Sequence, residues 1–363
     1  MVKGTILYIG GFQLPDKNAA ALRVISNAKA LRDIGYKVVF VNALSDYEGQ
    51  PRKVYYEGFL TYEYRRESQE KYLFSCRQII ALIERTNALI VIAYNYPAVA
   101  LNNLKSYCKE NGIKCYADAT EWYKPTGNLI FRLMKGFDTE LRMRYIQTRM
   151  DGVIAISEYL YQYYKDKVNT VKIPPLVDMD ENKWQTEDYC DHEGIKLIYA
   201  GSPSAQKEKL DVVVDAVESS NREDICLDVV GLTKEQYNEM YALQYQGNRV
   251  RFHGRVSNAQ VIQMTKKADW VVVLRERNKV VEAGFPTKIP EAISCGTPVI
   301  ANRFSNIEEY LDESNSILLD LFSELKGCLE VLQDKTNRNI DKRRFDYRKY
   351  MNEFQCLFGE DRR

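Results

Sequence analysis

Long runs of consecutive apolar residues, alternating with segments of helical periodicity, constrain the fold of this chain more than any other feature. Residues 5–11 form such a run, and the apolar positions within 18–34 follow the spacing of one helix face. Continuous rather than alternating apolar runs between helices indicate parallel strands that are covered on both faces. Further runs of this kind lie at 38–42, 88–94, 113–119 and 151–157.

The layout begins again after residues 176–194, which are acidic and aperiodic and are predicted to be a linker. Beyond the linker, apolar runs lie at 196–201, 226–231, 248–256, 270–276 and 297–302. A length of 363 residues also exceeds what one hydrophobic core usually fills. The sequence therefore predicts an α/β protein with two Rossmann-like doubly wound parallel-sheet domains, residues 1–175 and 195–335, that face each other across a cleft. Residues 336–363 are predicted to form a helical tail that packs back on the first domain.

The charge of the chain is nearly balanced, but its two halves differ. Of the 51 Lys and Arg residues, 25 lie in residues 1–175 with 17 of the 50 acidic residues, a balance of +8, and the other 26 and 33 give −7. Lobes of opposite charge could attract each other, or the basic lobe could meet an anionic partner such as a phospholipid surface or a phosphate-bearing acceptor. No Lys/Arg run or nucleic-acid motif accompanies the charge, so nucleic acid is not an expected partner.

The eight cysteines are scattered and form no C-x-x-C pair. Cys108 and Cys115, the closest two, are seven residues apart, which disfavours a zinc knuckle. The opening MVKGTILYIGG has too short an apolar run for a signal peptide or a membrane span and is expected to be the first strand. These features predict reduced thiols and a cytoplasmic protein.

Segment 275–300 has the features of a phosphate-binding helix. A strand ends near Arg275, and Pro286 is predicted to open a helix, since the missing N–H of proline is harmless in the first turn. The free N–H groups and the dipole at a helix start favour a phosphate. Lys288 adds a cation, and Glu291, three residues later on the same face, could accept both hydroxyls of a ribose. A surface helix with an incidental lysine and glutamate is an equal alternative on the residues alone.

The same segment resembles the signature of the retaining glycosyltransferases of family 4. Their second domain carries E-G-F-x, about four residues, and E-A-x-x-x-G-x-P-V-I, and this chain has Gly284-Phe285-Pro286, Glu291-Ala292 and Gly296-Thr297-Pro298-Val299-Ile300 in the same order and spacing. The segments GGFQLPDKN, DGVIAISEYL, KIPPLVD and YAGSPSAQK resemble other parts of the family, so the likeness spans nearly the whole chain. The form AGFPTK is similar to the branch acting in bacterial surface polysaccharide assembly. The resemblance implies the GT-B fold and a nucleotide-sugar donor.

The resemblance also implies which residues hold the diphosphate leaving group. Lys207 takes the place of the family's lysine, whereas Ser202, directly after Gly201, stands where the family has an arginine. Serine supplies no charge, so we expect Arg275 or Lys288 to make up the missing cation. Lys207, Lys288 and Arg275 are accordingly the expected catalytic residues.

The donor's sugar and ribose have their own expected contacts. By resemblance, Glu291 holds the ribose, and the loop beside the sugar contains Gly284 and Phe285, whose backbone N–H groups can donate. Ala283 stands where the family has the first glutamate of its signature, with Glu282 one residue early. The donor loop is expected to comprise Gly284, Phe285, Pro286 and Thr287.

The first domain is expected to supply the glycine-rich loop and the acceptor contacts. Gly10 and Gly11 follow the first strand, and in the resembled family this loop approaches the donor phosphate and the acceptor, because glycine lets the backbone come close. Asp118 and Glu121 follow another predicted strand, at the edge where ligands collect in such sheets. Both are candidates for acceptor contacts. An equal alternative is that Asp118 or Thr120 caps the start of a helix.

Segment 128–150 is predicted to be a basic amphipathic helix that could lie on an anionic membrane. A helix packed in the domain with a solvated arginine face is the alternative. Its apolar residues are Ile130, Phe131, Leu133, Met134, Phe137, Leu141 and Met143, and its basic residues are Arg132, Lys135, Arg142, Arg144 and Arg149.

Together these features predict a glycosyltransferase that moves a sugar from a nucleotide diphosphate, with a UDP-sugar favoured, to a saccharide or lipid-linked saccharide. The resemblance implies retention at the anomeric carbon, with the leaving phosphate as base. Neither His192 nor His253 is expected to be catalytic, and Asp178-Met179-Asp180 is interpreted as exposed linker rather than a metal site, so no cofactor and no metal are expected. The expected location is the cytoplasm, including the inner face of the membrane.

Other functions on the same fold are weighed against this one. A dinucleotide oxidoreductase requires G-x-G-x-x-G after a strand, and neither GGFQLP nor AGSPSA supplies it. A nucleotide-sugar epimerase or hydrolase would need a carboxylate or histidine set in the cleft, which only Asp118 and Glu121 could begin to provide. A catalytically silent nucleotide-sugar-binding protein is the third alternative, because of Ser202 and Ala283.

Overall fold

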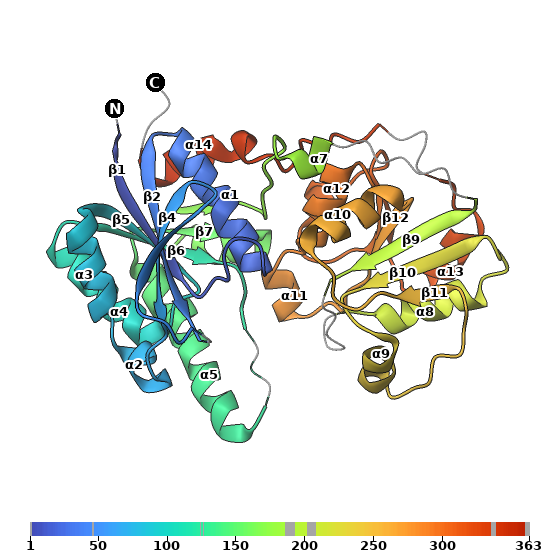
Figure 1. Ribbon diagram of the computed structural model, residues 1–363, viewed down its shortest axis with the longest axis horizontal. Helices are drawn as coiled ribbons and strands as arrows, with labels where there is room; N and C mark the ends of the chain where they lie inside the picture. Colours follow the sequence, from blue (N-terminus) through green and yellow to red (C-terminus); the bar gives the residue numbers. More distant parts are fainter. Residues whose placement is uncertain are drawn as a thin grey trace. The chain divides into compact units, whose positions relative to one another are not determined.

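The protein was analysed as a computed structural model that describes residues 2–45, 47–123, 125, 127–185, 193–201, 208–334 and 339–359. The chain divides into two compact units (Figure 1). The first comprises residues 1–176, 283–285 and 347–363, and the second comprises residues 177–282 and 286–346. Each unit is an α/β domain built on its own largely parallel sheet, so the predicted pair of Rossmann-like domains is confirmed.

The first unit is built on an eight-stranded sheet in the order β3-β4-β2-β1-β5-β6-β7-β8. Its neighbouring strands are parallel except for β3 and β4, an antiparallel hairpin at one edge that the sequence analysis did not predict. The strands are β1 (Gly4–Gly10), β2 (Tyr36–Leu44), β3 (Arg52–Tyr56), β4 (Phe59–Arg65), β5 (Ala88–Tyr94), β6 (Lys114–Ala119), β7 (Gly152–Ala155) and β8 (Thr170–Lys172).

The helix after β1 shows how local sequence sets an element of the first unit. Asn18 caps its start, because the side-chain oxygen accepts a hydrogen bond from the Ala21 N–H at 2.9 Å. Val24 and Leu31 are buried on the face that packs with Tyr8 of β1 in one core. The helices of this unit are α1 (Ala19–Asp33), α2 (Gln69–Phe74), α3 (Arg77–Thr86), α4 (Ala98–Glu110), α5 (Leu129–Leu141), α6 (Glu158–Tyr164) and α14 (Met351–Leu357), with short turns η1 (Arg142–Ile146), η2 (Gln147–Arg149) and η4 (Tyr347–Tyr350).

The last helix belongs to the first unit although it follows the second unit in sequence. The ring of Phe358 packs against Tyr36 of β2 and Tyr116 of β6, with ring centroids 5.3 and 5.1 Å away. The Tyr347 hydroxyl donates to Asp33 at the end of α1 at 2.7 Å. These contacts join residues far apart in the chain to the core of α1 and β1.

The second unit is built on a six-stranded parallel sheet in the order β11-β10-β9-β12-β13-β14. Its strands are β9 (Ile195–Ala200), β10 (Ile225–Val230), β11 (Val250–Phe252), β12 (Trp270–Val273), β13 (Val299–Asn302) and β14 (Ser316–Leu319). Its helices are α7 (Asn182–Gln185), α8 (Leu210–Ser219), α9 (Lys234–Tyr241), α10 (Asn258–Lys267), α11 (Lys279–Ala283), α12 (Lys288–Cys295) and α13 (Glu324–Glu330), with the short turn η3 (Ile307–Glu309).

In both units, the strand order reverses beside the first strand. The chain builds the sheet outward from β1 to β2 and then returns to place β5 on the other side, and β9, β10 and β12 repeat this pattern. In such sheets, ligands bind outside the carboxyl ends of the strands at the point of reversal. The loops after β1, β5, β9 and β12 are therefore the places to look for a site. Within the described residues, no helix is both long enough and apolar enough to cross a bilayer.

Candidate functional site

A cluster of buried charges lies at the carboxyl edge of the second sheet, where the strand order reverses. Glu208 follows β9 along the chain, and its backbone forms an isolated antiparallel bridge with Arg275, which follows β12. The Glu208 carboxylate accepts hydrogen bonds from Lys288 Nζ at 2.8 and 2.9 Å and from Arg275 Nη2 at 2.8 Å. One carboxylate thus holds two cations that come from separate loops.

All three side chains of this cluster are largely shielded from water. The exposed fractions are 6% for Glu208, 9% for Lys288 and 15% for Arg275. Lys288 also lies over the ring of Tyr199, with Nζ 3.8 Å from the centroid. Two cations and one anion leave a net charge of +1, so the cluster can attract an anionic group.

The charges of the cluster shift its pKa values in ways that follow from burial and proximity. Burial alone would raise the pKa of Glu208, but the positive charges of Lys288 and Arg275 lower it below its usual value. Burial lowers the pKa of Lys288 to about 8, and the attraction of Glu208 opposes this shift. Lys288 therefore remains mostly protonated at neutral pH and loses its charge in mildly alkaline solution.

Gly201, the residue directly after β9, lies against Lys288. Its φ of +142° is one that L residues with side chains rarely adopt, and an added Cβ would collide with the Lys288 Cε. Its backbone N–H donates to the Val230 carbonyl at 2.9 Å, which continues the sheet by one residue. Glycine at this position therefore lets the lysine side chain lie directly on the end of the strand.

The helix predicted to open at Pro286 begins two residues later. α12 runs from Lys288 to Cys295 with Thr287 at its N-cap, and Pro290 rather than Pro286 occupies the first turn. The Pro286 carbonyl instead accepts from the Ile289 N–H at 3.3 Å in the turn that precedes the helix. The correction places Lys288 at the first position of the helix, where its charge adds to the positive end of the dipole.

Glu291 lies one turn into α12 and is half-buried. Burial raises the pKa of its carboxyl to about 7, against the lowering effect of Lys183 and Lys288. Among the residues that the structure describes, none forms a hydrogen bond with its carboxylate. A carboxylate with vacant acceptor positions beside a cation cluster suits the vicinal hydroxyls of a ribose.

The loop before α12 is held in place by several contacts. The Ala283 carbonyl accepts from Ser157 Oγ at 2.9 Å, and residues 283–285 belong to the first unit. Phe285 is 6% exposed, so its side chain anchors the loop rather than facing solvent. Glu282 accepts from Arg277 Nε at 3.0 Å and from the Ser305 N–H at 3.1 Å, which engages both of its oxygens.

In the first unit, Gly10 and Gly11 lie at the carboxyl end of β1, as the sequence indicates. Gly10 is buried, and an added Cβ would lie 2.7 Å from Phe12 and 3.0 Å from Tyr94. Gly11 is exposed, and an added Cβ would lie 2.6 Å from Nη2 of Arg66. The packing around Gly10 leaves little room for a side chain there, and the contact at Gly11 places the end of the flexible Arg66 side chain at the predicted loop.

Asp118, expected to contact an acceptor or to cap a helix, lies inside the core instead. It is part of β6 and 0% exposed, and its carboxylate accepts from Arg23 Nη2 at 2.8 Å and from the Tyr8 hydroxyl at 2.5 Å. The Arg23 guanidinium also donates to the Ile173 carbonyl at 3.0 Å. A carboxylate so enclosed joins strands and helix α1 and has no surface with which to contact a ligand.

Polar residues that remain accessible lie just beyond Asp118. Glu121 is half-buried, and among the described residues none forms a hydrogen bond with its side chain. Asn95, after β5, donates to the Thr120 hydroxyl at 2.6 Å and has a left-handed backbone with φ of 42°. This group lies at the carboxyl edge of the first sheet and remains a candidate acceptor site.

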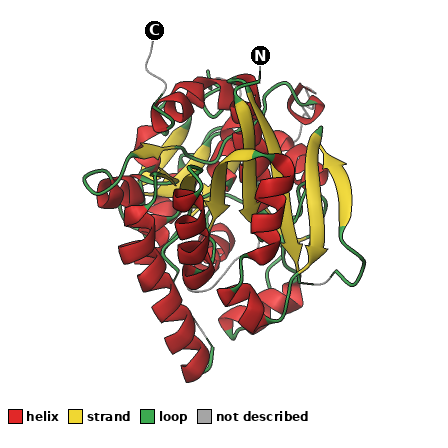
Figure 2. Ribbon diagram, turned by 90° about the vertical axis from the view of Figure 1, so that its left-hand side faces the viewer, coloured by secondary structure: helices red, strands yellow, loops and turns green. Residues whose placement is uncertain are grey.

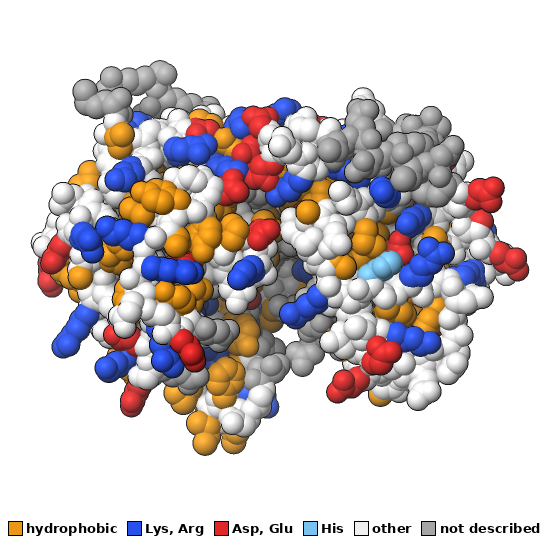
Figure 3. All heavy atoms as spheres, viewed as in Figure 1, with side chains coloured by type: hydrophobic (Ala, Val, Ile, Leu, Met, Phe, Trp, Pro, Cys, Tyr) orange, Lys and Arg blue, Asp and Glu red, His pale blue; other side chains and the backbone are white. Residues whose placement is uncertain are grey.

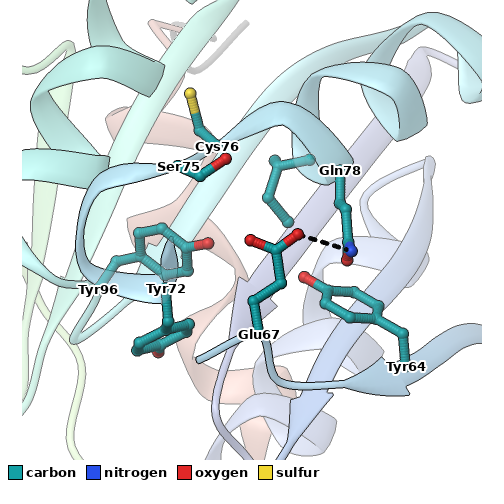
Figure 4. A pocket seen from close by; sticks show the side chains of 8 residues that line it. Tyr64, Glu67, Tyr72, Ser75, Cys76, Gln78 and Tyr96 are labelled. Carbon is teal, nitrogen blue, oxygen red and sulfur yellow. Dashed lines mark hydrogen bonds between the residues drawn. The ribbon is translucent and has the colours of Figure 1, made fainter. Parts of the chain in front are cut away.

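A pocket lies beside this edge on the side of α2 and α3 (Figure 4). Glu67 in its wall accepts from Gln78 Nε2 at 3.2 Å. The Arg66 guanidinium, which touches Gly11, also stacks over the pocket residue Tyr72 at 4.3 Å. The pocket is lined by Tyr64, Glu67, Tyr72, Ser75, Cys76, Gln78, Ile79 and Tyr96, none of which the sequence analysis singled out.

The histidine and the acidic pair considered in the sequence have ordinary partners. His253 Nε2 lies 2.8 Å from Asp228 Oδ1. Asp178 accepts from the Asp180 N–H at 3.2 Å, and Asp180 pairs with Arg343 at 3.4 Å. Within the described residues, no group of three His, Cys, Asp or Glu side chains is arranged to hold a metal ion. Ser202, Lys207 and His192 lie outside the described residues.

The second unit also matches a known family. Residues 194–329 match the family model described as glycosyl transferases group 1. These residues form a glycosyltransferase group 1 domain. The domain contains Gly201, Glu208, Arg275, Lys288 and Glu291, so the charge cluster lies wholly within the matched enzyme domain. Among curated proteins, no match was found.

Solved structures resemble the whole chain. Sucrose-phosphate synthase from Thermosynechococcus elongatus superposes with a TM-score of 0.74 at 16% identity, over 99% of this chain and 99% of its own. HepE from Anabaena in complex with UDP and glucose superposes with a TM-score of 0.66 at 16% identity, over 99% of this chain and 100% of HepE. The lipopolysaccharide outer core galactosyltransferase WaaB in its apo form superposes with a TM-score of 0.63 at 14% identity, over 98% of this chain and 99% of WaaB. These similarities confirm the GT-B fold.

Glu208 is the main residue of the site that sequence reasoning missed. It follows Lys207 directly in the sequence QKEKL, which is typical of a charged, solvent-exposed segment. An acidic residue beside a predicted phosphate-binding lysine has no obvious part in binding an anion. The structure shows its use, since it holds Lys288 and Arg275 together.

Proposed function

We propose that this protein is a metal-independent retaining glycosyltransferase that transfers a sugar from a nucleotide diphosphate to an acceptor. The observation that carries the proposal is the buried cluster of Lys288, Arg275 and Glu208 at the carboxyl edge of the sheet in the glycosyltransferase group 1 domain. A net positive cluster beside a helix start is suited to a diphosphate, because both stabilise negative charge.

In the proposed reaction, the bond between the anomeric carbon and the diphosphate breaks, and the bonding electrons leave with the diphosphate. Lys288 and Arg275 stabilise the charge that grows on the leaving oxygen. That oxygen accepts the proton of the acceptor hydroxyl, which attacks from the same side, so configuration is retained without a protein base. Loss of one such charge contact typically costs about 3–4 kcal/mol of transition-state stabilisation.

Recognition of the nucleotide is assigned to Glu291, with a UDP-sugar as the favoured donor. Its half-buried carboxylate has acceptor positions to spare and lies three residues after Lys288 on one helix face. HepE, which shares the fold, is described in complex with UDP and glucose. Lys207 and Ser202 would complete the diphosphate contacts, and Gly284, Phe285, Pro286 and Thr287 would border the sugar.

The proposed acceptor is a saccharide or lipid-linked saccharide in surface polysaccharide biosynthesis, met at the cytoplasmic face of the membrane. WaaB, which shares the fold, is described as a lipopolysaccharide outer core galactosyltransferase. Glu121 and Asn95 at the edge of the first sheet offer carboxylate and amide groups that can bind sugar hydroxyls, and the buried Thr120 hydroxyl holds the Asn95 amide in place. Arg66, beside Gly11, adds a cation for an acceptor phosphate.

The proposal is tested by incubating the protein with UDP-, GDP- and other activated sugars and candidate acceptors, with products detected by mass spectrometry. A chelator is expected to leave transfer unchanged, and NMR of the product is expected to show the anomeric configuration of the donor. An inverted product would exclude the retaining mechanism. Nucleotide binding by calorimetry without transfer or hydrolysis would favour a silent binding protein instead.

A further inference from the structure

The first two turns of α5 form an apolar tip. All eight residues from 127 to 134 are exposed, and α5 extends away from the rest of its unit (Figures 1 and 2). Hydrophobic side chains gather at its far end (Figure 3). We define the α5 tip as the six large apolar residues exposed there. Their exposed fractions are 68% for Leu129, 71% for Ile130, 47% for Phe131, 65% for Leu133, 60% for Met134 and 70% for Phe137.

Such a concentration is unusual, because large apolar side chains exposed singly are normal but contiguous patches mark interaction surfaces. Exposure of these side chains to water is unfavourable. Packing inside the unit does not offset this cost, since their exposed fractions show that they contribute little to its core. The helix itself is secured by a cap, in which Asn128 accepts from the Phe131 N–H at 2.9 Å. The tip is therefore an ordered structural element that presents apolar surface outward.

The structure corrects the basic half of the segment predicted to lie on a membrane. α5 gives way to the π-helical turn η1 and the 3-10 turn η2, so 128–150 is not one regular helix. Arg142 is 2% exposed and donates to the Asn95 carbonyl at 2.9 Å, and Arg144 pairs with Glu140. The prediction that this segment lies flat on a membrane through Arg142 is therefore wrong, because the Arg142 side chain is buried in the interior of the unit.

The distribution of the tip residues around α5 favours insertion by the helix end. Successive residues of a helix turn by about 100°, so the six side chains cover more than half of the circumference. A helix lying flat would leave part of this set in water, whereas end-on insertion buries all of it. From Leu129 to Phe137 the helix rises about 12 Å, comparable with the depth of roughly 5–10 Å that interfacial helices reach.

The charges near the tip match an anionic lipid surface. Between residues 127 and 137 the only charged side chains are Arg132 and Lys135, and no acidic residue is present. The positive end of the helix dipole lies at the same end. The next carboxylate along the chain, Asp138, lies 3.5 Å from Lys135 Nζ and is mostly buried. Anionic headgroups would therefore meet cations around an apolar centre.

A second copy of the chain is a poorer match to this surface. A stable protein interface typically buries about 800 Å² on each partner and involves roughly 20–30 residues a side. Six side chains on a convex tip fall short of that, and a convex surface needs a matching groove in a protein partner. A bilayer requires no such groove, because lipids rearrange around the inserted side chains.

We propose that the α5 tip inserts end-on into the surface of an anionic phospholipid bilayer and docks the first unit there. This docking goes beyond the transferase proposal and needs no donor. Its consequence, that the acceptor reaches Gly11 and Glu121 from the membrane side, does rest on the proposed function.

The first test measures binding of the full chain to phosphatidylcholine vesicles with and without phosphatidylglycerol. The triple variant Ile130→Gln, Leu133→Gln and Phe137→Gln is expected to lower the partition coefficient on the order of a thousandfold, since burial of each of the three side chains is worth about tenfold or more. A matched variant with Tyr55→Gln, Leu321→Gln and Val331→Gln, whose side chains are 70%, 62% and 77% exposed, is expected to bind as the parent does. Equal partitioning of the tip variant and the parent would overturn the proposal.

A second test reports the orientation of the helix. The native Trp122, Trp184 and Trp270 are 4%, 6% and 1% exposed, so bilayer quenchers should affect them little. With brominated lipids, Leu129→Trp is expected to be quenched from deeper in the bilayer than Phe137→Trp. Equal depths for the two would mean a flat helix and would contradict end-on insertion.

Three further measurements separate the alternatives. Arg132→Gln with Lys135→Gln is expected to weaken binding to phosphatidylglycerol vesicles and to leave binding to neutral vesicles unchanged. A dimer seen by light scattering, lost in the tip variant and accompanied by no vesicle binding, would assign the tip to a second copy and overturn lipid docking. Titration with UDP is expected to give the same affinity for the parent and the tip variant. Absence of UDP binding in both, with vesicle binding intact, would reject the transferase proposal alone.

Discussion

Glu208→Gln is the substitution that most directly tests how the charge cluster is built. The change keeps the size of the side chain and removes the carboxylate that, within the part of the chain the structure describes, holds both Lys288 and Arg275. Since those cations are 9% and 15% exposed, water can compensate for the lost charge only in part. We expect the second unit to become less stable and Lys288 to lose its proton more easily.

The magnitude follows from the distances and the burial. Opposite charges about 3 Å apart attract by roughly 5 kcal/mol at the effective dielectric constant of about 20 that reproduces most protein measurements. The desolvation of Glu208 itself offsets part of this gain, because an ionised carboxylate is costly to bury. Removal of one member of a buried ion pair typically costs about 3–5 kcal/mol in unfolding free energy, which is the loss expected here.

The assay is denaturant unfolding of the full chain, with UDP affinity measured by calorimetry on the same samples. Glu308→Gln is the matched control, because Glu308 pairs with Arg303 on the surface at 51% exposure and should contribute less than about 1 kcal/mol. Adding Lys288→Met to Glu208→Gln is expected to restore much of the stability, since it removes a cation left unpaired, and to weaken UDP binding further. An unfolding free energy for Glu208→Gln equal to that of the control would refute this account of the cluster.

Three other predictions concern the same two units. UDP affinity is expected to peak between about pH 7 and pH 8, because the raised pKa of Glu291, about 7, makes it lose its charge as the pH falls, and the lowered pKa of Lys288, about 8, makes it lose its charge as the pH rises. A flat affinity profile by calorimetry would contradict both assignments. The same shifts imply that the unfolding free energy falls as the pH rises towards 7, because folded Glu291 holds its proton more tightly than the unfolded chain does. The unfolding free energy then rises above pH 8, because folded Lys288 releases its proton more readily than the unfolded chain does. Glu291→Ala should weaken UDP binding strongly, while unchanged affinity would remove it from the ribose. Asp118→Asn is expected to cost about 3–5 kcal/mol in unfolding free energy, since it leaves buried Arg23 without its ion pair, and to leave UDP affinity unaltered; a stability equal to that of the parent would show that the buried pair is not structural.

The strands and the fold class could be predicted because their signal is local. A continuous apolar run such as 88–94 fits a strand buried on both faces, and β5 occupies those residues. The edge hairpin was missed for the same reason. β4 alternates buried and half-buried residues, and β3 is mostly exposed, so neither forms a continuous apolar run. Its turn has left-handed conformations at Glu57 and Gly58, a signal that only the glycine suggests in the sequence.

The start of α12 shows where local rules reach their limit. Proline fits the first turn of a helix equally well at Pro286 and Pro290, and the sequence alone favoured the earlier one. The burial of Phe285 and the anchoring of the Ala283 carbonyl by Ser157 hold the preceding loop in a non-helical path. Contacts from another part of the chain therefore decided the boundary.

The sequence by itself determined the two α/β domains and the strands that are continuous apolar runs, and by resemblance it predicted the type of ligand for the second domain. Those features depend on apolar periodicity and on residues close together in the chain, whose preferences are read directly. Only the tertiary structure decided which charges meet. Glu208 contacts cations 67 and 80 residues away, and Asp118 is paired with Arg23 across 95 residues. A carboxylate that looks accessible in the sequence can thus be part of the core, because burial and pairing are set by packing across the whole unit.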